Sequence, residues 1–373
     1  MVGERSWTSA DGHQIQVRIA VHAIRRIAGA TVLDWSVTPI EGPNLQPGDL
    51  LPEGFDLGLS RPDESVPKVL LIDAPRGSVY RPLRSERVPY HCLCTPISAS
   101  QSSLRIGVTR MLQIAFPALP AAVSAVDVSL ATVPQFSRVP VLAPGRAPLA
   151  VAPTDLTRPA EPGDPAARTS MFRYGPGEQV FRLRIHRVLT SSTFTSLEWA
   201  IVSVTGGRGV DSASTPPFAR RDSTAGTIRN PIAASGPTLR VPGLRNPLRA
   251  RVLTTGADPD EPGECLCTDL RDWPGVLRRP DKVATVVTNY PALPPGTKRV
   301  EVAFPGHPAI MVTVSQTADP SRRTVATTPV SPRHWRFRVA SPATGWDVGD
   351  WPTPVPEPEQ LDSYDATVDR LLR

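Results

Sequence analysis

The sequence has no long apolar run, almost no lysine and none of the common motifs of enzymes. No segment approaches the ~18 consecutive apolar residues of a membrane-spanning helix, so no membrane span is expected. All but three of the 41 basic residues are arginine, scattered without the aromatic interleaving of a nucleic-acid groove. Dinucleotide, phosphate-loop, zinc-protease and nucleophile-elbow motifs are missing. We therefore expect no catalytic residue, no cofactor, no metal and no nucleic-acid partner.

Proline is the abundant residue, with 44 among 373 residues, more than twice the usual share of about 5 %. Proline has no amide donor and ends helices, so this density favours short strands separated by turns over long helices. The length is sufficient for two ordinary domains with additional tails.

Two segments near the N-terminus alternate apolar and polar residues with the two-residue period of a half-buried strand. Residues 14–24 place isoleucine or valine at alternate positions and put Arg18 and His22 on the other face. Residues 31–38 repeat the alternation around Trp35. The Ala-Gly-Ala between the two segments permits a turn. The pattern predicts a β-hairpin with Trp35 in the core.

The pattern of this hairpin returns 164 residues later, where the acidic-Trp pair that ends in Trp35 reappears as a pair that ends in Trp199. The tetrapeptide Cys-Leu-Cys-Thr at 92–95 recurs at 265–268, shifted by 173. The aromatic-Pro-Ala-Leu-Pro turn that follows is shifted by 174. A period this long indicates duplicated domains rather than a solenoid, with Trp35 and Trp199 as equivalent core anchors.

These patterns predict an all-β protein made of two tandem antiparallel β-sandwiches related by duplication. The expected units are residues 1–142 and residues 179–314. Residues 143–178 are predicted to form a Pro-rich linker. Residues 315–373 are predicted to form a partly extended C-terminal tail with one further strand and a short amphipathic helix.

Four features resemble the immunoglobulin-like repeats of actinobacterial proteins: the hairpin ending in Asp/Glu-Trp, the Cys-x-Cys-Thr segment, the aromatic-Pro-Ala-Leu-Pro turn and the Val-Asp/Glu-Val strand after it. Some of those repeats occur beside peptidoglycan-binding domains of the outer-membrane-protein-A type. The resemblance covers both units, about three quarters of the chain. It implies tandem immunoglobulin-like sandwiches with a structural or interaction role.

All four cysteines belong to the repeated tetrapeptide: Cys92, Cys94, Cys265 and Cys267. On a strand, residues two apart face the same side, so the two sulfurs of each pair lie close together. The duplication favours a local disulfide in each unit, which requires a bend because straight strands hold such Cα atoms near the upper limit for bridging. Two alternatives remain: reduced, buried thiols, and one zinc site with four cysteines, although zinc knuckles use wider Cys-x₂₋₄-Cys spacing.

Histidines and carboxylates offer weaker candidates. His22 and His186 occupy equivalent positions on the polar face of the first strand, which predicts a solvated face. His91 precedes the first Cys-Leu-Cys, but Glu264 stands at that place in the second unit, which argues against a Cys–His nucleophile. The acidic residues 258–264 lack the spacing of a calcium loop and predict a solvated loop.

The tail carries apolar residues where no core is expected, and these are candidate residues for docking to a protein partner. Three are tryptophans in Pro-rich sequence: Trp335, Trp346 and Trp351. Four recur at helical intervals near the C-terminus: Leu361, Tyr364, Val368 and Leu371.

The sequence thus predicts a non-catalytic structural or interaction module with an unidentified protein partner. The alternative is a carbohydrate- or ligand-binding β-sandwich protein of an extracellular or cell-envelope assembly. No secretory signal is visible in the first residues. This predicts the cytoplasm for the chain as written, and the envelope or exterior if a leader precedes it.

Overall fold

The structure is a computed structural model, and it describes eleven segments of the chain. These are residues 3–8, 16–41, 69–83, 93–94, 110–130, 133–143, 169–174, 179–205, 234–253, 264–268 and 283–317. The described residues form an all-β protein whose one helical turn is the 3-10 turn η1 (Ala74–Arg76). In this part of the chain, no helix has the length and apolar character needed to cross a membrane.

The first half of the fold is an eight-stranded sheet that folds over itself into two layers. Its strands are β1 (Gly3–Thr8), β2 (Gln16–Ile27), β3 (Ala30–Glu41), β4 (Val69–Asp73), β5 (Ser78–Tyr80), β6 (Arg110–Pro117), β7 (Ala125–Leu130) and β8 (Val133–Leu142). Their order is β5-β4-β7-β8-β2-β3-β6, with β1 paired to β2. The turn between β2 and β3 contains Gly29 with a φ of 76°, a conformation that glycine adopts without strain.

The second half is a seven-stranded sheet folded in the same way. Its strands are β9 (Thr169–Tyr174), β10 (Gln179–Thr190), β11 (Phe194–Ser203), β12 (Thr238–Arg240), β15 (Val283–Pro291), β16 (Arg299–Ala303) and β17 (Ile310–Gln316). Their order is β12-β16-β17-β10-β11-β15, with β9 paired to β10. Two short strands, β13 (Val252–Leu253) and β14 (Glu264–Cys265), pair with each other.

The two halves share unusual details of strand pairing. In each half the last long strand pairs in parallel with the first hairpin strand, at Ile24 with Val141 and at Val188 with Val314. The remaining pairs within these sheets are antiparallel. The common order is the arrangement that the repeated sequence predicts, and a duplication remains our interpretation of it.

Each half has its own apolar core between its two layers. Trp35 and Trp199 are fully buried, one in each core. Because side chains alternate along a strand, the inward residues of β2, β3 and β6 meet those of β4, β7 and β8. Trp199 also packs edge-on against Phe304, with the ring centroids 5.0 Å apart, a favoured geometry for aromatic pairs.

The first strand of each half lies outside the strands that the sequence predicts. Strand β1 precedes residues 14–24, and β9 falls within residues 143–178, the predicted linker. Both are antiparallel edge strands added to the first strand of a hairpin. Edge strands need only backbone partners on one side, which explains why periodicity alone did not identify them.

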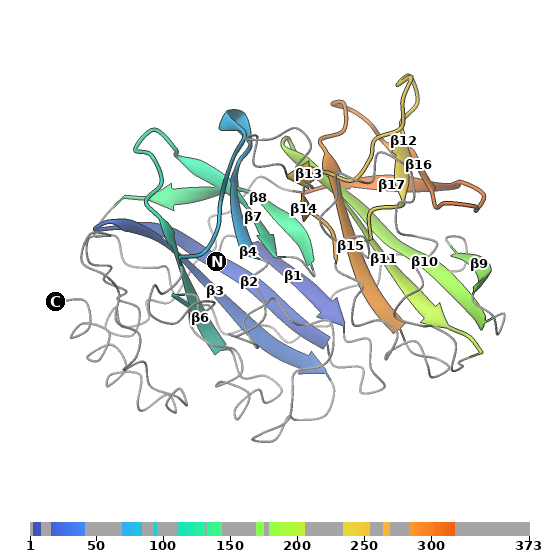
Figure 1. The fold of residues 1–373 in the computed structure, drawn as a ribbon, viewed down its shortest axis with the longest axis horizontal. Helices are drawn as coiled ribbons and strands as arrows, with labels where there is room; N and C mark the ends of the chain where they lie inside the picture. The colour runs from blue at the N-terminus through green and yellow to red at the C-terminus, as the bar shows by residue number, and fades with distance from the viewer. Residues whose placement is uncertain are drawn as a thin grey trace.

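The two halves stack side by side, with blue-to-teal strands in one and green-to-orange strands in the other (Figure 1). Strand β8 contacts β11 and β15 across the boundary. We call this the inter-half contact: the outward face of β4, β7 and β8 against the outward face of β11, β15 and the segment 264–268. Both sandwiches are therefore held in one relative orientation.

Candidate functional site

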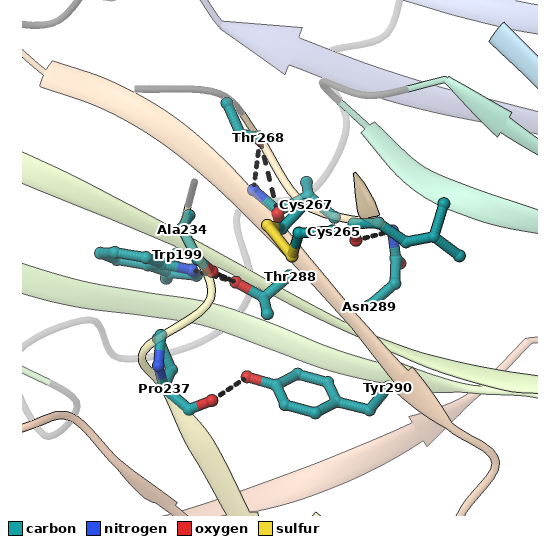
Figure 2. Close-up of a disulfide and its surroundings, with 11 residues drawn as sticks. Trp199, Ala234, Pro237, Cys265, Cys267, Thr268, Thr288, Asn289 and Tyr290 are labelled. Carbon is teal, nitrogen blue, oxygen red and sulfur yellow. Dashed lines mark hydrogen bonds between the residues drawn. A yellow bond between two sulfur atoms is a disulfide. The ribbon is translucent and has the colours of Figure 1, made fainter. Parts of the chain in front are cut away.

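The Cys-Leu-Cys segment of the second half contains a local disulfide. Cys265 and Cys267 are bonded, with an S–S distance of 2.06 Å and a Cα–Cα distance of 5.2 Å, well within bridging range. Both cysteines are buried and belong to the core of the second half (Figure 2). The local pairing expected for this unit is present, and the zinc and reduced-thiol alternatives are excluded for this pair.

Backbone hydrogen bonds explain why both sulfurs point inward. Segment 264–268 adds to the edge of β15, where the Thr268 amide donates to the Val287 carbonyl at 2.9 Å and the Asn289 amide donates to Leu266 at 3.0 Å. The Asn289 side chain donates to the same Leu266 carbonyl at 2.9 Å. Alternation along this strand turns the cysteines toward the core and Leu266 toward the first half.

The first half repeats this arrangement at Leu93 and Cys94. The Leu93 amide donates to Leu83, and the Ala115 amide donates to Leu93, both at 2.8 Å. Cys94 forms an isolated antiparallel backbone β-bridge with Ile114, as Cys267 does with Thr288. Cys94 also lies in the core of the first half. Cys94 is disulfide-bonded; Cys92 lies outside the described residues, so the local pairing of this unit remains a prediction.

A polar network surrounds the disulfide in the second half. The Trp199 indole donates to the Thr288 hydroxyl at 3.2 Å, and that hydroxyl donates to the Ala234 carbonyl at 2.7 Å. The Tyr290 hydroxyl donates to the Pro237 carbonyl at 2.9 Å (Figure 2). Burial raises the pKa of Tyr290 above its usual range, so the phenol remains a hydrogen-bond donor.

The described residues of the first half lack this network because two residues differ. Ile114 stands in the place of Thr288 and Phe116 in the place of Tyr290, by the 174-residue shift. The Trp35 indole nitrogen consequently has no hydrogen-bond partner among the described residues, a cost of about 1–3 kcal/mol for a buried donor. The polar network therefore distinguishes the second half from an otherwise equivalent core.

Both hairpins pair the acidic residue before tryptophan with an arginine. Arg25 donates to Asp34 through Nε and, at 2.9 Å, through Nη2. Arg187 donates to Glu198 at 2.5 Å. Burial raises the pKa of Asp34, while the hydrogen bond and charge of Arg25 act in the opposite direction. These carboxylates have fixed structural partners, as expected for buried charges.

The first hairpin corrects the expectation of a solvated polar face. His22 is 1 % exposed, and its Nε2 is 2.7 Å from the Ser36 hydroxyl. Burial lowers the pKa of His22 to about 3, so the ring is neutral at ordinary pH. His186, its equivalent, is half-buried. Alternation alone cannot tell whether a second layer covers the polar face of a strand.

The inter-half contact has an apolar centre and a polar surround. Leu266 packs against Leu70 and Ile72 of the first half. Nearby, the backbone N–H of Gln135 donates to the Ser196 hydroxyl at 3.3 Å, and that hydroxyl donates to the side-chain oxygen of Asn289 at 2.5 Å.

Asp127 contributes to the same boundary from the first half. Its carboxylate accepts from the Arg138 amide at 2.8 Å, holding a β-bulge where Arg138 has a φ of 47°. Burial raises the pKa of Asp127, while the hydrogen bonds of Arg138 and Thr193 and the charge of Arg251 oppose this. Thr193 and Arg251 come from the second half, so Asp127 is polarised by both halves.

The other candidates fall partly outside the described residues. His91 and the docking residues of the tail, Trp335, Trp346, Trp351, Leu361, Tyr364, Val368 and Leu371, all lie there. So does most of the acidic loop 258–264. Within the segments that the structure describes, no three His, Cys, Asp or Glu residues gather as a metal site would require.

No family model matches the chain, and no curated protein matches it. Similarity to solved structures is weak. A candidate lipoprotein of Staphylococcus aureus aligns with 40 % of this chain and 100 % of its own, at 9 % identity and a TM-score of 0.19. A conserved domain protein of Bacillus anthracis aligns with 80 % of this chain and 76 % of its own, at 10 % identity and a TM-score of 0.19. Scores this low carry no argument about fold or function.

Proposed function

We propose that this chain is a non-catalytic interaction protein that holds two β-sandwiches in a fixed orientation and presents their surfaces, with the C-terminal tail, to a protein partner. The observation that carries the proposal is the inter-half contact. Leu70, Ile72 and Leu266 form a buried apolar centre between the halves, and Ser196 and Asn289 extend it with hydrogen bonds. In an isolated sandwich these outward-facing residues would be exposed to solvent, whereas here they join two sandwiches.

Two further observations support this proposal. The buried carboxylates Asp34 and Glu198 are engaged by arginines in structural pairs, rather than exposed to a substrate. The disulfide of Cys265 and Cys267 is typical of oxidising compartments, which favours an extracytoplasmic location. The likeness to immunoglobulin-like repeats agrees with such a role and remains a prediction.

The test is a binding screen of the full chain against the extracellular and envelope proteins of its source, with each hit measured by biolayer interferometry. We expect saturable binding at micromolar or lower concentration that is insensitive to EDTA and weakened by charge changes on exposed strands. A protein screen without hits, together with specific binding on a glycan array, would refute the proposal in favour of the carbohydrate-binding alternative.

A further inference from the structure

Among the described residues, the outward face of β12, β16 and β17 is the free end of the stack of sheets. It corresponds to the face of β4, β7 and β8 that the second half covers, because Leu239 pairs with Val302 as Leu71 pairs with Val128. In the first half this face is buried throughout β4. In the second half it is open, and Met311 on β17 is 49 % exposed.

The residues on this free face differ from those of the covered face. By the same register, Thr238 and Arg240 stand in the places of Leu70 and Ile72, the residues of the first half that contact Leu266 of the second half. A face with arginine at its centre is not suited to the apolar contact that joins the two halves. A segment that binds this face therefore needs polar or charged groups, unlike the apolar Leu266 that binds the equivalent face of the first half.

Five exposed cations gather on this face and at one end of it: Arg240, Arg245, Arg249, Lys298 and Arg299. Arg240 and Arg299 point outward because their neighbours Leu239 and Val300 are buried in the core. Arg249 shares that face, since Leu248 pairs with Leu239 and packs on the core. We call these five residues the basic face.

The described residues of this region carry almost no negative charge. Glu301 is the one carboxylate in the described residues 234–253 and 283–317, and it lies opposite Arg240. The two large apolar side chains exposed in the described part of the chain, Leu244 and Met311, also lie here, in the turn after β12 and on β17. The basic face therefore suits a ligand that combines carboxylates with apolar groups.

The C-terminal sequence has that composition. Residues 346–369 contain seven aspartates and glutamates and no Lys, Arg or His. They also contain apolar residues, at positions Trp346, Trp351, Leu361, Tyr364 and Val368. We propose that residues 346–369 dock on the basic face of the same chain, with carboxylates on its arginines and apolar side chains against Met311 and Leu244.

Residues 346–369 can reach the basic face, because the described chain ends close to it. Strand β17 is one of the three strands that form the basic face, and it ends at Gln316. Residues 318–345 connect it to the acidic residues 346–369. Extended, these 28 residues span up to about 95 Å, several times the width of a three-stranded sheet. A tether of this length raises the effective concentration to about the millimolar range, so docking within one chain prevails over docking between dilute copies.

This inference rests on the proposed function in treating the tail as a docking segment, and it names where the tail docks before a partner binds. Its test needs no partner, so its failure leaves the binding screen unaffected. The reverse also holds, because the screen detects binding through any other surface.

The test is zero-length carbodiimide crosslinking of the full chain, followed by mass spectrometry. Carbodiimide joins carboxylates to amines, and the chain has only three lysines: Lys68, Lys282 and Lys298. Lys298 lies at the end of the basic face, directly before Arg299. We expect crosslinks from Lys298 to carboxylates of 346–369, lowered at least about fivefold by 0.5 M NaCl because screening weakens exposed ion pairs. Mixing ¹⁴N- and ¹⁵N-labelled protein should show links within single chains.

Matched charge variants provide the control. Arg240→Glu with Arg299→Glu should lower the Lys298 crosslinks at least about fivefold, since each repels the acidic segment. Arg182→Glu with Arg184→Glu makes the same change in charge on β10, outside the basic face, and should leave the yield unchanged. Circular dichroism and the thermal midpoint verify that both variants are folded. The proposal is overturned if the segment links mainly to Lys68 or Lys282, links mainly between copies, gives no Lys298 link, or responds equally to both variants.

Discussion

Replacing Leu266 by alanine is expected to weaken the inter-half contact. Leu266 is 4 % exposed and packs with Leu70 and Ile72 across the boundary. The substitution removes three buried carbon atoms, worth about 2.4 kcal/mol in transfer free energy alone. The cavity left between two sheets adds to this loss, so we expect a total of about 2–5 kcal/mol.

The assay is urea unfolding followed by tryptophan fluorescence and by hydrogen exchange. Fluorescence sums over the seven tryptophans of the chain, so amide exchange along β2 and β3 and along β10 and β11 follows the two cores separately. The free energy of unfolding is compared with that of the unmodified protein. Arg182→Ala is the control, because this side chain is exposed on β10 and surface truncations usually change stability by less than about 0.5 kcal/mol.

A double-mutant cycle then locates the effect at the boundary. Combining Leu266→Ala with Leu70→Ala, and separately with Ile72→Ala, should give a coupling of about 0.5–3 kcal/mol in at least one cycle, as residues in contact do. Leu93→Ala, at the equivalent leucine of the first half, should be additive with Leu266→Ala. Additivity in every cycle would refute the inter-half contact.

Three further outcomes are expected. Thr288→Val removes the acceptor of the Trp199 indole and should lower the free energy of unfolding by about 1–3 kcal/mol, measured with urea; an unchanged value would show that this network is not stabilising. The pKa of His22 is lowered to about 3, so the unfolded chain takes up the proton first. Stability should fall as pH drops from about 6.5, approaching about 1.4 kcal/mol per pH unit, and His22→Gln should remove this part of the slope. Iodoacetamide in denaturant should leave Cys265 and Cys267 unlabelled before reduction and label both afterwards, and labelling without reductant would contradict the disulfide.

Much of the fold could be predicted because its signals are local. Alternation over 14–24 and 31–38 identifies the first hairpin, which the structure has as β2 and β3. Tryptophan at the centre of such a strand is expected in the core, because burying its large apolar surface is favourable. The disulfide was also predictable for Cys265 and Cys267, because residues two apart on a strand face the same side.

The basic face could not be predicted, since its residues are separated along the sequence. Arg240 and Arg299 are neighbours only because β12 pairs with β16. The sequence shows scattered arginines, and the register of a three-stranded sheet gathers them. The burial of His22 was not predicted for a related reason. Its strand has the alternation of a half-buried strand, yet both faces of the strand are covered in the fold.

The amino-acid sequence by itself determined the all-β class, the strands of the two hairpins and their core tryptophans, and it favoured the local pairing of Cys265 with Cys267, because each depends on residues a few positions apart or on a direct repeat. The tertiary structure alone decided how the halves meet. Leu70 and Leu266 carry no signal of their contact, since each is simply an outward leucine on its own strand. Only when two folded sheets are brought face to face does the burial of both leucines stabilise the protein, and the opposite face of the second half is then left without a covering strand among the described residues.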